Sequence, residues 1–500
     1  MIAARLMLRV ACVLSLAAAA SVVPAGATDV NGTLAVDPSR LAGADELGRV
    51  LLYTPNPLEL GSSIAHWDLS AAPDLLMEPT ASQSVPFGEV DLTLPHFRDL
   101  GWPGGSSTLT VRVKDAADQG FNDPTVVAAA PANPGGTTLG GQRLAALQWA
   151  TARWSTLLGS AIEINIDSAF DELDCDPDGG AVLAAAGARF LFSGFANAPR
   201  QDTWYHGALA EALAGENLSF TEDGRPADFG DVIVTFNSQI DEGCLAPSFR
   251  FYYGLDGNTP TGQASFAMVA LHEIAHGLGF SNFVNLGTGE LPSFPGFPKQ
   301  PDIYTVYTFD TDLGLHWDVM TADERRSSAV NTDRVVWDGP LTVAAAPDVL
   351  DNAPRLTINS PPSVAGSYAV QTAQFGPPVD LPGVTADLAV VRDGSSEPTL
   401  GCEPPVNAGE IAGRIAVIDR GTCFFTVKVK HVQDAGAVAA IIVNNQPSGL
   451  PPMGGDDPTI TIPSVGISQA DGTLIKNALG LNTNPPRRAG RRLTPSGGTP

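Results

Sequence analysis

Two histidines and a glutamate near the middle of the chain form a pattern that can bind a metal ion and use it. His272, Glu273 and His276 lie in the string Leu-His-Glu-Ile-Ala-His at positions 271–276. Histidines four residues apart share one face of a helix, so both imidazoles can reach a single ion. Glu273 then projects towards a water on that ion. The pattern predicts a zinc site, and the alternative is a buried helix that carries two histidines by chance.

The neighbouring residues predict the helix that would position this pattern. Residues 262–271 are largely apolar, and Thr261 or Ser265 can cap the helix N-terminus. Gly277 and Gly279 follow the second histidine, and glycine accepts the left-handed conformation of a sharp helix end. We therefore expect a helix that begins near residue 261 and ends at these glycines.

A third zinc ligand is missing from the helix itself. The metzincin pattern H-E-x-x-H-x-x-G-x-x-H asks for a glycine, which Gly279 supplies, and then for a histidine at position 282. That position holds Asn282, whose amide oxygen is a poor zinc ligand. The third ligand must therefore come from elsewhere in the chain.

The first residues and the overall charge indicate an exported protein. Residues 1–27 have the pattern of a signal peptide, with Arg5 and Arg9 before an apolar run and a cleavage site near Ala27. That run is too short for a membrane anchor, and no later apolar segment reaches the length of about 18 residues that spans a bilayer. The formal net charge of −26 argues against nucleic acid and anionic membranes as partners. We expect a secreted protein.

The cysteines predict two disulfides. Cys12 lies in the signal peptide, which leaves Cys175, Cys244, Cys402 and Cys423. An even number of cysteines in an exported chain is typical of disulfides, and proximity favours pairing the first two and the last two among the three possible connectivities. Because the chain has no C-x-x-C pair, a thiolate zinc site is disfavoured.

Apolar periodicity predicts an α+β architecture with two main parts. Residues 103–345 combine a helix at 142–158 with strands at 161–166 and 231–236, and with the metal-binding helix beneath the sheet. Prolines punctuate residues 341–361 and mark a boundary. Beyond it, strand, helix and strand patterns follow one another as in a small α/β domain, and residues 481–500 have the composition of a disordered tail.

The second part resembles a protease-associated (PA) domain. The resemblance rests on residues 413–428, 433–445 and 462–468, and it extends over residues 362–480. It implies a non-catalytic lid or recognition module of a secreted hydrolase. The alternative is an unrelated β-α-β module.

A segment near the N-terminus resembles leishmanolysin-like metzincins. Residues 61–79 contain His66 before a tryptophan and Met77 eleven residues later, as in the segment of that family that carries the third zinc histidine and the Met-turn. The resemblance, which includes residues 272–280, implies a metzincin-like catalytic domain. His66 would complete the zinc site, and Met77 would form an apolar floor beneath the ion.

The order of segments departs from that family, which places the His-Trp segment after the catalytic helix. Here residues 28–102, which we assign to the catalytic domain, carry it and come first; of these, residues 32–102 look as though they belong after about residue 483. A circular permutation explains this order, because chain ends often lie close together. A rearranged gene or a faulty gene model is the alternative.

Other side chains compete for the third ligand position. His316 repeats the His-Trp-Asp triplet of residues 66–68, but Met320 follows it after only four residues. Glu290 and Asp302 are weaker rivals, because prolines around them disfavour a ligand-bearing helix. We interpret the remaining histidines as surface or packing residues: His96, His206 and His431.

These features predict a secreted zinc-dependent endopeptidase that acts on protein or peptide substrates. Zinc held by three histidines leaves a position for water, and Glu273 would take the proton of that water and pass it to the leaving amine. The strand at 231–236 is a candidate edge for pairing with substrate.

The alternatives are a non-catalytic binding protein with a structural zinc and PA-mediated recognition, and an amidase-like hydrolase of small substrates. Residues 174–180 are a weak candidate for calcium and otherwise a solvated loop; the sequence sets no oligomeric state.

Overall fold

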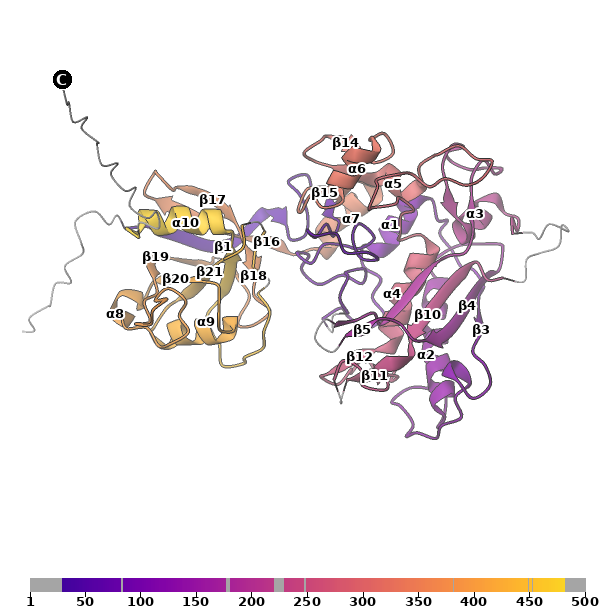
Figure 1. The fold of residues 1–500 in the computed structure, drawn as a ribbon, viewed down its shortest axis with the longest axis horizontal. Coiled ribbons are helices and arrows are strands. Elements are labelled where there is room, and N and C mark those ends of the chain that lie inside the picture. The colour runs from indigo at the N-terminus through magenta and orange to yellow at the C-terminus, as the bar shows by residue number, and fades with distance from the viewer. Residues whose placement is uncertain are drawn as a thin grey trace, which may run out of the picture. The chain divides into compact units, whose positions relative to one another are not determined.

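The computed structural model divides the chain into two compact units, Asp37–Ala353 and a second one that joins the residues before 37 to those from Pro354 onwards (Figure 1). The predicted signal peptide and residues 482–500 of the predicted tail lie outside the described residues. Within the described part, no helix has the length and apolarity needed to cross a membrane. The structure describes residues 29–81, 84–176, 180–219, 229–246, 249–380, 382–447, 449–451 and 453–481.

The larger unit is built on a four-stranded sheet of order β3-β4-β10-β7. Strands β3, β4 and β10 are parallel, and β7 runs antiparallel to β10 at one edge. The strand predicted at 231–236 as a substrate-pairing edge is therefore internal, because β10 bonds to a strand on each side. The four strands are β3 (Leu109–Val113), β4 (Ile164–Asp171), β7 (Ala184–Ala188) and β10 (Val232–Asn237).

Two long helices pack on this sheet, α2 (Leu139–Ser155) and α4 (Phe266–Leu278). Ser265 caps α4 by accepting a hydrogen bond from the backbone N–H of Met268. Gly279 ends the helix with a φ of +143°, as expected. Gly277, predicted as a second helix-ending residue, instead lies inside α4, where an added Cβ would come within 2.1 Å of a Val232 methyl group. That glycine lets α4 lie close against β10.

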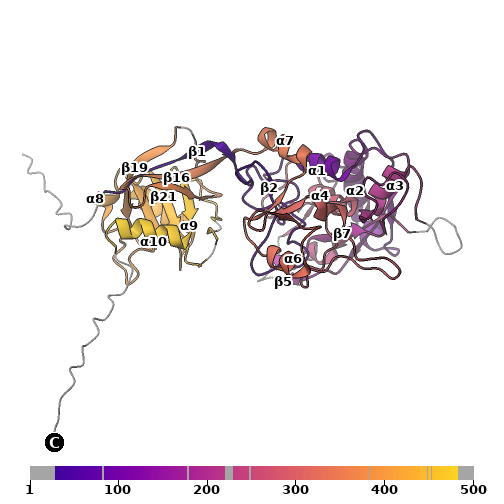
Figure 2. The ribbon, with the colours of Figure 1, turned by 90° about the horizontal axis from the view of Figure 1, so that it is seen from above.

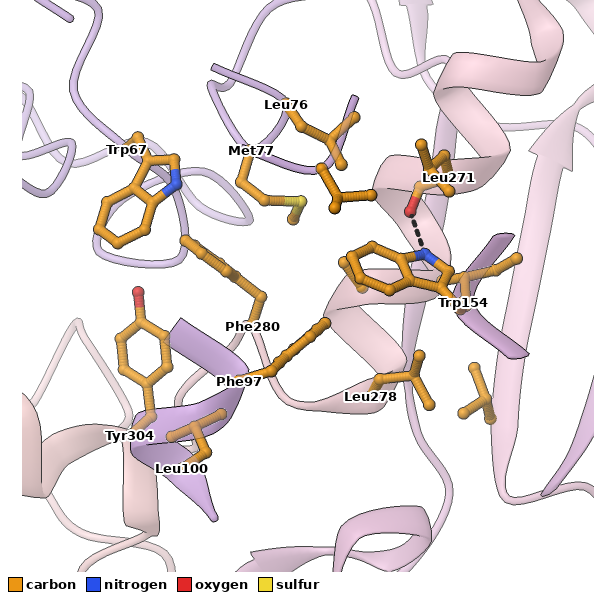
Figure 3. Close-up of a cluster of buried hydrophobic side chains, with 14 of the residues drawn as sticks. Trp67, Leu76, Met77, Phe97, Leu100, Trp154, Leu271, Leu278, Phe280 and Tyr304 are labelled. Atoms are coloured by element: carbon orange, nitrogen blue, oxygen red, sulfur yellow. Dashed lines mark hydrogen bonds between the residues drawn. The ribbon is translucent and has the colours of Figure 1, made fainter. Parts of the chain in front are cut away.

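A buried indole joins the two helices (Figure 3). The Trp154 indole N–H of α2 donates to the Leu271 carbonyl of α4 at 2.9 Å. The indole N–H of Trp102, which precedes both helices in the chain, donates to the Leu278 carbonyl of α4 at 2.9 Å. Trp154 is fully buried, and burying such a side chain stabilises the fold by roughly 2–3 kcal/mol. The helix that carries the predicted metal ligands is thus held along its length.

A second sheet, of order β14-β13-β15-β2, brings the N-terminal segment into the larger unit. β2 (Val50–Leu51) pairs antiparallel with β15 (Val335–Trp337), and the Leu52 N–H continues the ladder to the Val335 carbonyl. The other elements of the unit are α1 (Thr93–Leu100), β5 (Cys175–Asp176), β6 (Gly180–Ala181), β8 (Leu191–Phe192), β9 (Tyr205–His206), α3 (Gly207–Ala214), β11 (Arg250–Tyr252), β12 (Gln263–Ser265), α5 (Ile303–Tyr307), β13 (Thr308–Asp310), β14 (Leu315–His316), α6 (Ala322–Ser328), α7 (Pro340–Val349) and the short 3-10 turns Gly120–Asn122 and Ser238–Ile240.

The smaller unit contains an eight-stranded sheet of order β17-β16-β1-β19-β20-β21-β22-β18. Its first strand, β1, pairs antiparallel through Asn31–Leu34 with β19, so residues 29–36 belong here and not with the segment 28–102 as predicted. The elements are β1 (Asn31–Leu41), β16 (Asn352–Ser360), β17 (Gly366–Ala369), β18 (Gln371–Thr372), β19 (Val384–Val390), α8 (Ala408–Ile411), β20 (Ile415–Asp419), α9 (Phe425–Asp434), β21 (Ala439–Val443), β22 (Ser464–Ile467) and α10 (Gln469–Ala478).

Alternating side chains give this sheet two apolar faces. Val417 and Ile441 pack with Ile475 of α10, while Ile418 and Ile442 pack in a separate cluster with Val429 of α9. Because successive residues of a strand face opposite sides, the two helices cover opposite faces, and Figure 1 shows α10 and α9 on either side of the strands. Figure 2 shows the same elements from above. The predicted strand–helix–strand pattern corresponds to β20, α9 and β21.

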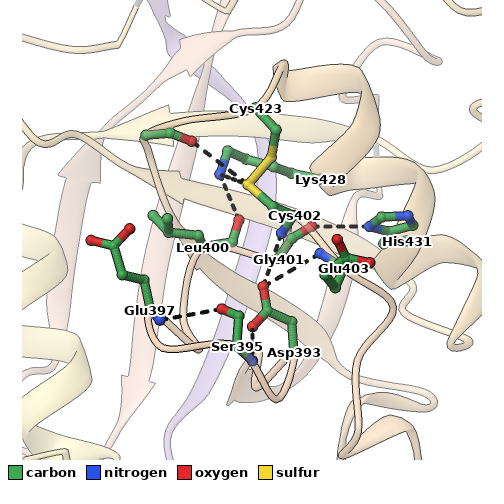
Figure 4. The surroundings of a disulfide bond; sticks show 11 residues. Asp393, Ser395, Glu397, Leu400, Gly401, Cys402, Glu403, Cys423, Lys428 and His431 are labelled. Carbon is green, nitrogen blue, oxygen red and sulfur yellow. Dashed lines mark hydrogen bonds between the residues drawn. A yellow bond between two sulfur atoms is a disulfide. The ribbon is translucent and has the colours of Figure 1, made fainter.

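Both predicted disulfides are confirmed. Cys175 bonds to Cys244 and Cys402 bonds to Cys423, at sequence separations of 69 and 21. The shorter loop is closed beside a buried lysine (Figure 4). The Lys428 ammonium donates to the Leu400 carbonyl at 2.6 Å and lies 3.6 Å from the Cys402 sulfur. Burial lowers the pKa of Lys428 to about 8, although nearby Asp419 and Asp393 favour its charged form.

Lys428 should make stability depend on pH. Its pKa is lower in the folded chain than the value of about 10.4 in an unfolded chain, so between these values the unfolded state binds more protons and stability rises with pH. We expect Lys428→Met to remove a gain of up to about 3 kcal/mol between pH 8 and 10.5, measured as urea midpoints of the full chain. Lys430→Met on the same helix is the control, and equal slopes in both variants would contradict the assignment.

Candidate metal site and cleft

Two imidazoles of helix α4 and one from the N-terminal segment of the larger unit converge on one point. The Nε2 atoms of His66, His272 and His276 lie 3.1–3.2 Å from one another. Among the described residues, these three form the one group of three or more potential ligand side chains with such spacing. The structure therefore brings together the three residues that the sequence proposed as ligands.

Each imidazole is oriented by a backbone carbonyl. His66 Nδ1 lies 2.8 Å from the Ser62 oxygen, His272 Nδ1 lies 2.6 Å from the Leu76 oxygen, and His276 Nδ1 lies 2.7 Å from the Phe280 oxygen. A carbonyl only accepts, so each Nδ1 must carry the proton. Each neutral ring then presents an unprotonated Nε2 to the other two.

Three lone pairs that face one another repel unless a cation lies between them, so the donor set fits a metal ion. Burial lowers the pKa of His272 to about 4 and that of His276 to about 3, and it lowers that of His66 as well, with the neighbouring imidazoles adding to the effect for His66 and His276. The rings are therefore neutral and able to ligate. Ligands at 2.0–2.1 Å in a tetrahedron are about 3.3 Å apart, close to the spacing seen here.

His66 reaches this point through the segment that follows β2. The Ile64 N–H donates to the Tyr53 carbonyl and the Tyr53 N–H donates to the His66 carbonyl, which folds the segment back on itself. Ile64, with a φ of +69°, makes the turn, and the Tyr304 hydroxyl donates to its carbonyl at 2.7 Å. The hairpin thus fixes His66 over α4.

Glu273 faces the same cleft as the three histidines. It is 8 % exposed, and burial raises the pKa of its carboxyl group to about 8. A bound dication would favour the carboxylate and lower that value. Glu273 is therefore placed to exchange a proton with a group near the metal site.

The cleft has a volume of about 1560 Å³ and is lined mainly by apolar side chains. One wall consists of residues 181–186, which lead into the edge strand β7 and include its first three residues. Residues from the segment 281–287, beyond the end of α4, also line the cleft. Among the described residues, Glu78 and Glu273 are the two carboxyl groups that line it, and the described lining residues include neither a lysine nor an arginine.

The rival ligands have other partners. His316 Nε2 lies 2.6 Å from the Asp338 carboxylate, and this hydrogen bond raises the pKa of His316. Glu290 pairs with Lys299 at 2.6 Å, and Asp302 caps α5 by accepting from the Thr305 N–H. Asn282 lines the cleft, with its side-chain oxygen accepting from the Val284 N–H. The three remaining histidines do not belong to the metal site: His96 and His206 are fully buried, and His431 faces the Gly401 carbonyl.

Two other predicted features stay predictions. Met77, the expected apolar floor beneath the ion, is fully buried, and its carbonyl accepts from the Trp67 N–H. The candidate calcium segment 174–180 lies in part outside the described residues, which exclude 177–179. Sequence reasoning missed the carbonyls that orient the histidines and the carboxyl group of Glu78, because backbone acceptors leave no trace in residue types.

Comparison with known proteins identifies one domain of the chain. Residues 384–475 match the PA domain family. Human ER degradation-enhancing alpha-mannosidase-like protein 3 is 32% identical over 94 residues, 17% of this chain and 10% of that protein. Leucine aminopeptidase 2 of Arthroderma otae is 35% identical over 98 residues, 20% of this chain and 18% of that protein.

Solved structures give a similar result. BSAP, a zinc aminopeptidase from Bacillus subtilis, is 30% identical over 23% of this chain and 26% of its own, with a TM-score of 0.19. An aminopeptidase from Aneurinibacillus sp. strain AM-1 is 27% identical over 24% of this chain and 26% of its own, also with a TM-score of 0.19. The chain thus spans about a quarter or less of the length of the proteins named here.

These findings correct the predicted family. The chain is a mixed α/β protein with a PA domain, and the proteins it matches include leucine aminopeptidase 2, so the assignment to leishmanolysin-like metzincins and to a metzincin-like fold was wrong. The assignment rested on a short segment and on H-E-x-x-H. Such motifs describe local chemistry that recurs on unrelated folds.

Removing one imidazole should abolish tight zinc binding. We expect His66→Ala to weaken zinc affinity by more than about 100-fold, beyond the 10–100-fold typical of residues that only orient a ligand. Competition with a chromophoric chelator measures the affinity. His316→Ala is the matched control, since its ring pairs with Asp338. Zinc loss in the control, with retention in His66→Ala, would show that the ligand set is wrong.

Proposed function

We propose that this chain is a zinc-dependent peptidase. The observation that carries the proposal is the convergence of three unprotonated Nε2 atoms beside a buried carboxyl group in one large cleft. His66, His272 and His276 would hold the ion. A zinc ion bound by three histidines supplies an acidified water and a Lewis acid for a carbonyl oxygen.

The chain's own residues perform the remaining tasks. Glu273 takes a proton from the attacking water and delivers it to the leaving amine, the role of a general base that then acts as an acid. Its burial matters, because a carboxyl group removed from water has a pKa closer to neutral pH than an exposed one. The carbonyls of Ser62, Leu76 and Phe280 keep the three imidazoles in the ligating tautomer.

The edge strand β7 is the proposed binding surface for the substrate backbone. It bonds to β10 on one side, and several of its residues line the cleft on the way to the metal site. An extended peptide can add to such an edge through main-chain hydrogen bonds. This replaces the role predicted for the strand at 231–236.

The size of the cleft supports cleavage inside a peptide. Its volume of about 1560 Å³ exceeds the roughly 300–1,000 Å³ of most small-molecule sites, so it has room for several residues on an extended chain. The second candidate is removal of N-terminal residues. It is favoured by the relatives, because a zinc aminopeptidase and leucine aminopeptidase 2 are among them.

Export is part of the proposal. The two disulfides suit an oxidising compartment outside the cytosol, in keeping with the predicted signal peptide. The PA domain would then act as a non-catalytic recognition module. The three-histidine set in an accessible cleft speaks against a structural zinc, which normally has four protein ligands.

Glu273→Gln should separate catalysis from metal binding. The amide cannot accept a proton, so hydrolysis of casein or a labelled peptide should fall at least about 100-fold, the lower range of a general base's contribution. Zinc stoichiometry should stay at the wild-type value, because Glu273 is not a ligand in this proposal. Full peptidase activity in the variant would refute the proposed mechanism.

A pair of peptides that differ only at the amino terminus decides where the chain cuts. For internal cleavage we expect an N-acetylated apolar decapeptide and its free form to be cut at the same bond and at rates within about threefold, since the terminus lies far from the site. Mass spectrometry of the products measures this. Stepwise loss of single N-terminal residues, seen with the free peptide alone, would instead support the aminopeptidase.

A further inference from the structure

One turn of the chain contacts both of the segments that carry the three histidines. The turn Leu75–Glu78 offers the Leu76 carbonyl to His272 Nδ1 at 2.6 Å. Its Met77 carbonyl accepts from the N–H of Trp67, the residue after His66, at 2.8 Å. Figure 3 shows Met77 beside Trp67 and Leu76 on the side of helix α4. A shift of this turn would therefore move both histidine-bearing segments.

Two carboxyl groups hold the turn through its backbone N–H groups. Glu78 Oε1 accepts from the Leu75 N–H at 2.9 Å, and Asp91 Oδ2 accepts from the Leu76 N–H at 2.5 Å. The other oxygen of Asp91 accepts from the N–H and the hydroxyl of Thr93, the first residue of α1. Asp91 thus ties the turn to a helix, whereas Glu78 closes it on itself.

The cost of burying these groups indicates that the turn requires the two carboxyl acceptors. Glu78 is 3 % exposed, and burying a carboxyl group is costly unless its hydrogen bonds offset the loss of water. Leu75 and Leu76 are also buried, so their N–H groups would each lose about 1–3 kcal/mol without an acceptor. A well-packed apolar residue at position 78 would leave the Leu75 N–H unsatisfied. The carboxyl groups are therefore needed by the turn.

We propose that Glu78 and Asp91 are positioning residues of the metal site, which fix the Leu76 carbonyl and through it the ring of His272. The inference rests on the proposed function, since it takes the three histidines to be zinc ligands. Neither carboxyl group touches the ion or the scissile bond in this role. Residues that orient ligands in this way typically contribute 10–100-fold in metal affinity.

Substitutions of similar size test whether position 78 acts as a hydrogen-bond acceptor for the turn. Glu78→Gln keeps a side-chain oxygen that can accept from the Leu75 N–H, whereas Glu78→Met has a similar size and no comparable acceptor. We expect Glu78→Met to bind zinc about 10–100-fold more weakly, with a changed visible spectrum of the Co²⁺ form, and Glu78→Gln to stay within about threefold of wild type. The matched control is Glu89→Met, at an exposed carboxylate of the same segment.

A readout without metal tests the turn itself. In the metal-free chain, amide hydrogen exchange at residues 75–78 should be faster in Glu78→Met than in wild type or Glu78→Gln, because the Leu75 N–H has lost its acceptor. If Glu78→Met does not fold, Asp91→Asn takes its place. The amide has one acceptor oxygen where the carboxylate serves two sets of donors, so the same weakening of zinc binding is expected.

The outcomes separate this inference from the proposed function. Wild-type zinc binding without peptide hydrolysis would remove the proposed function and leave the positioning role in place. Wild-type zinc affinity and exchange in Glu78→Met, or in Asp91→Asn where that variant is used, would overturn the positioning role. Loss of zinc affinity in Glu78→Gln equal to that in Glu78→Met would also overturn it, because the charge and not the acceptor would then matter.

Discussion

The mutual approach of three unprotonated imidazole nitrogens is the constraint on which the larger unit depends. The unprotonated Nε2 atoms lie 3.1–3.2 Å apart and cannot form hydrogen bonds with one another, because none of them carries a proton. The surrounding chain must therefore impose the arrangement. It does so with three carbonyls that fix the tautomers, with a glycine that lets α4 approach β10, and with indole hydrogen bonds that clamp the helix. A cation between the rings, as proposed, would convert this repulsive core into a coordination site.

Burial and ligation work in the same direction here. Low exposure holds the imidazoles neutral near pH 7, so no proton has to leave a ring before a metal binds. The same burial raises the pKa of Glu273 to about 8. A dication between the imidazoles would lower that pKa and favour the carboxylate, the form that the proposed base requires. One physical cause, the exclusion of water around α4, therefore shapes both the proposed ligands and the proposed base.

The sequence predicted what residue types and spacing encode. The helix with its two histidines, the β20–α9–β21 pattern and the disulfide pairs follow from periodicity and cysteine counting. The edge strand β7 escaped prediction because Ala184–Ala188 is made of alanine and glycine, without β-branched or aromatic residues. The roles of Glu78 and Asp91 escaped because they act on backbone groups, and family membership was misjudged because a motif reports chemistry more reliably than ancestry.

Chain order matters less to such a site than the contacts that build it. His66 lies 206 residues before His272, yet loop-closure entropy grows only with the logarithm of loop length. A tenfold longer loop costs only about 2 kcal/mol, whereas zinc binding to a structural site in a small peptide contributes about 10–16 kcal/mol. The pairing of β2 with β15 and the bond from Tyr304 to Ile64 hold the early segment in place before an ion binds. A ligand from near the N-terminus is therefore energetically as acceptable as one from the residues that follow the helix.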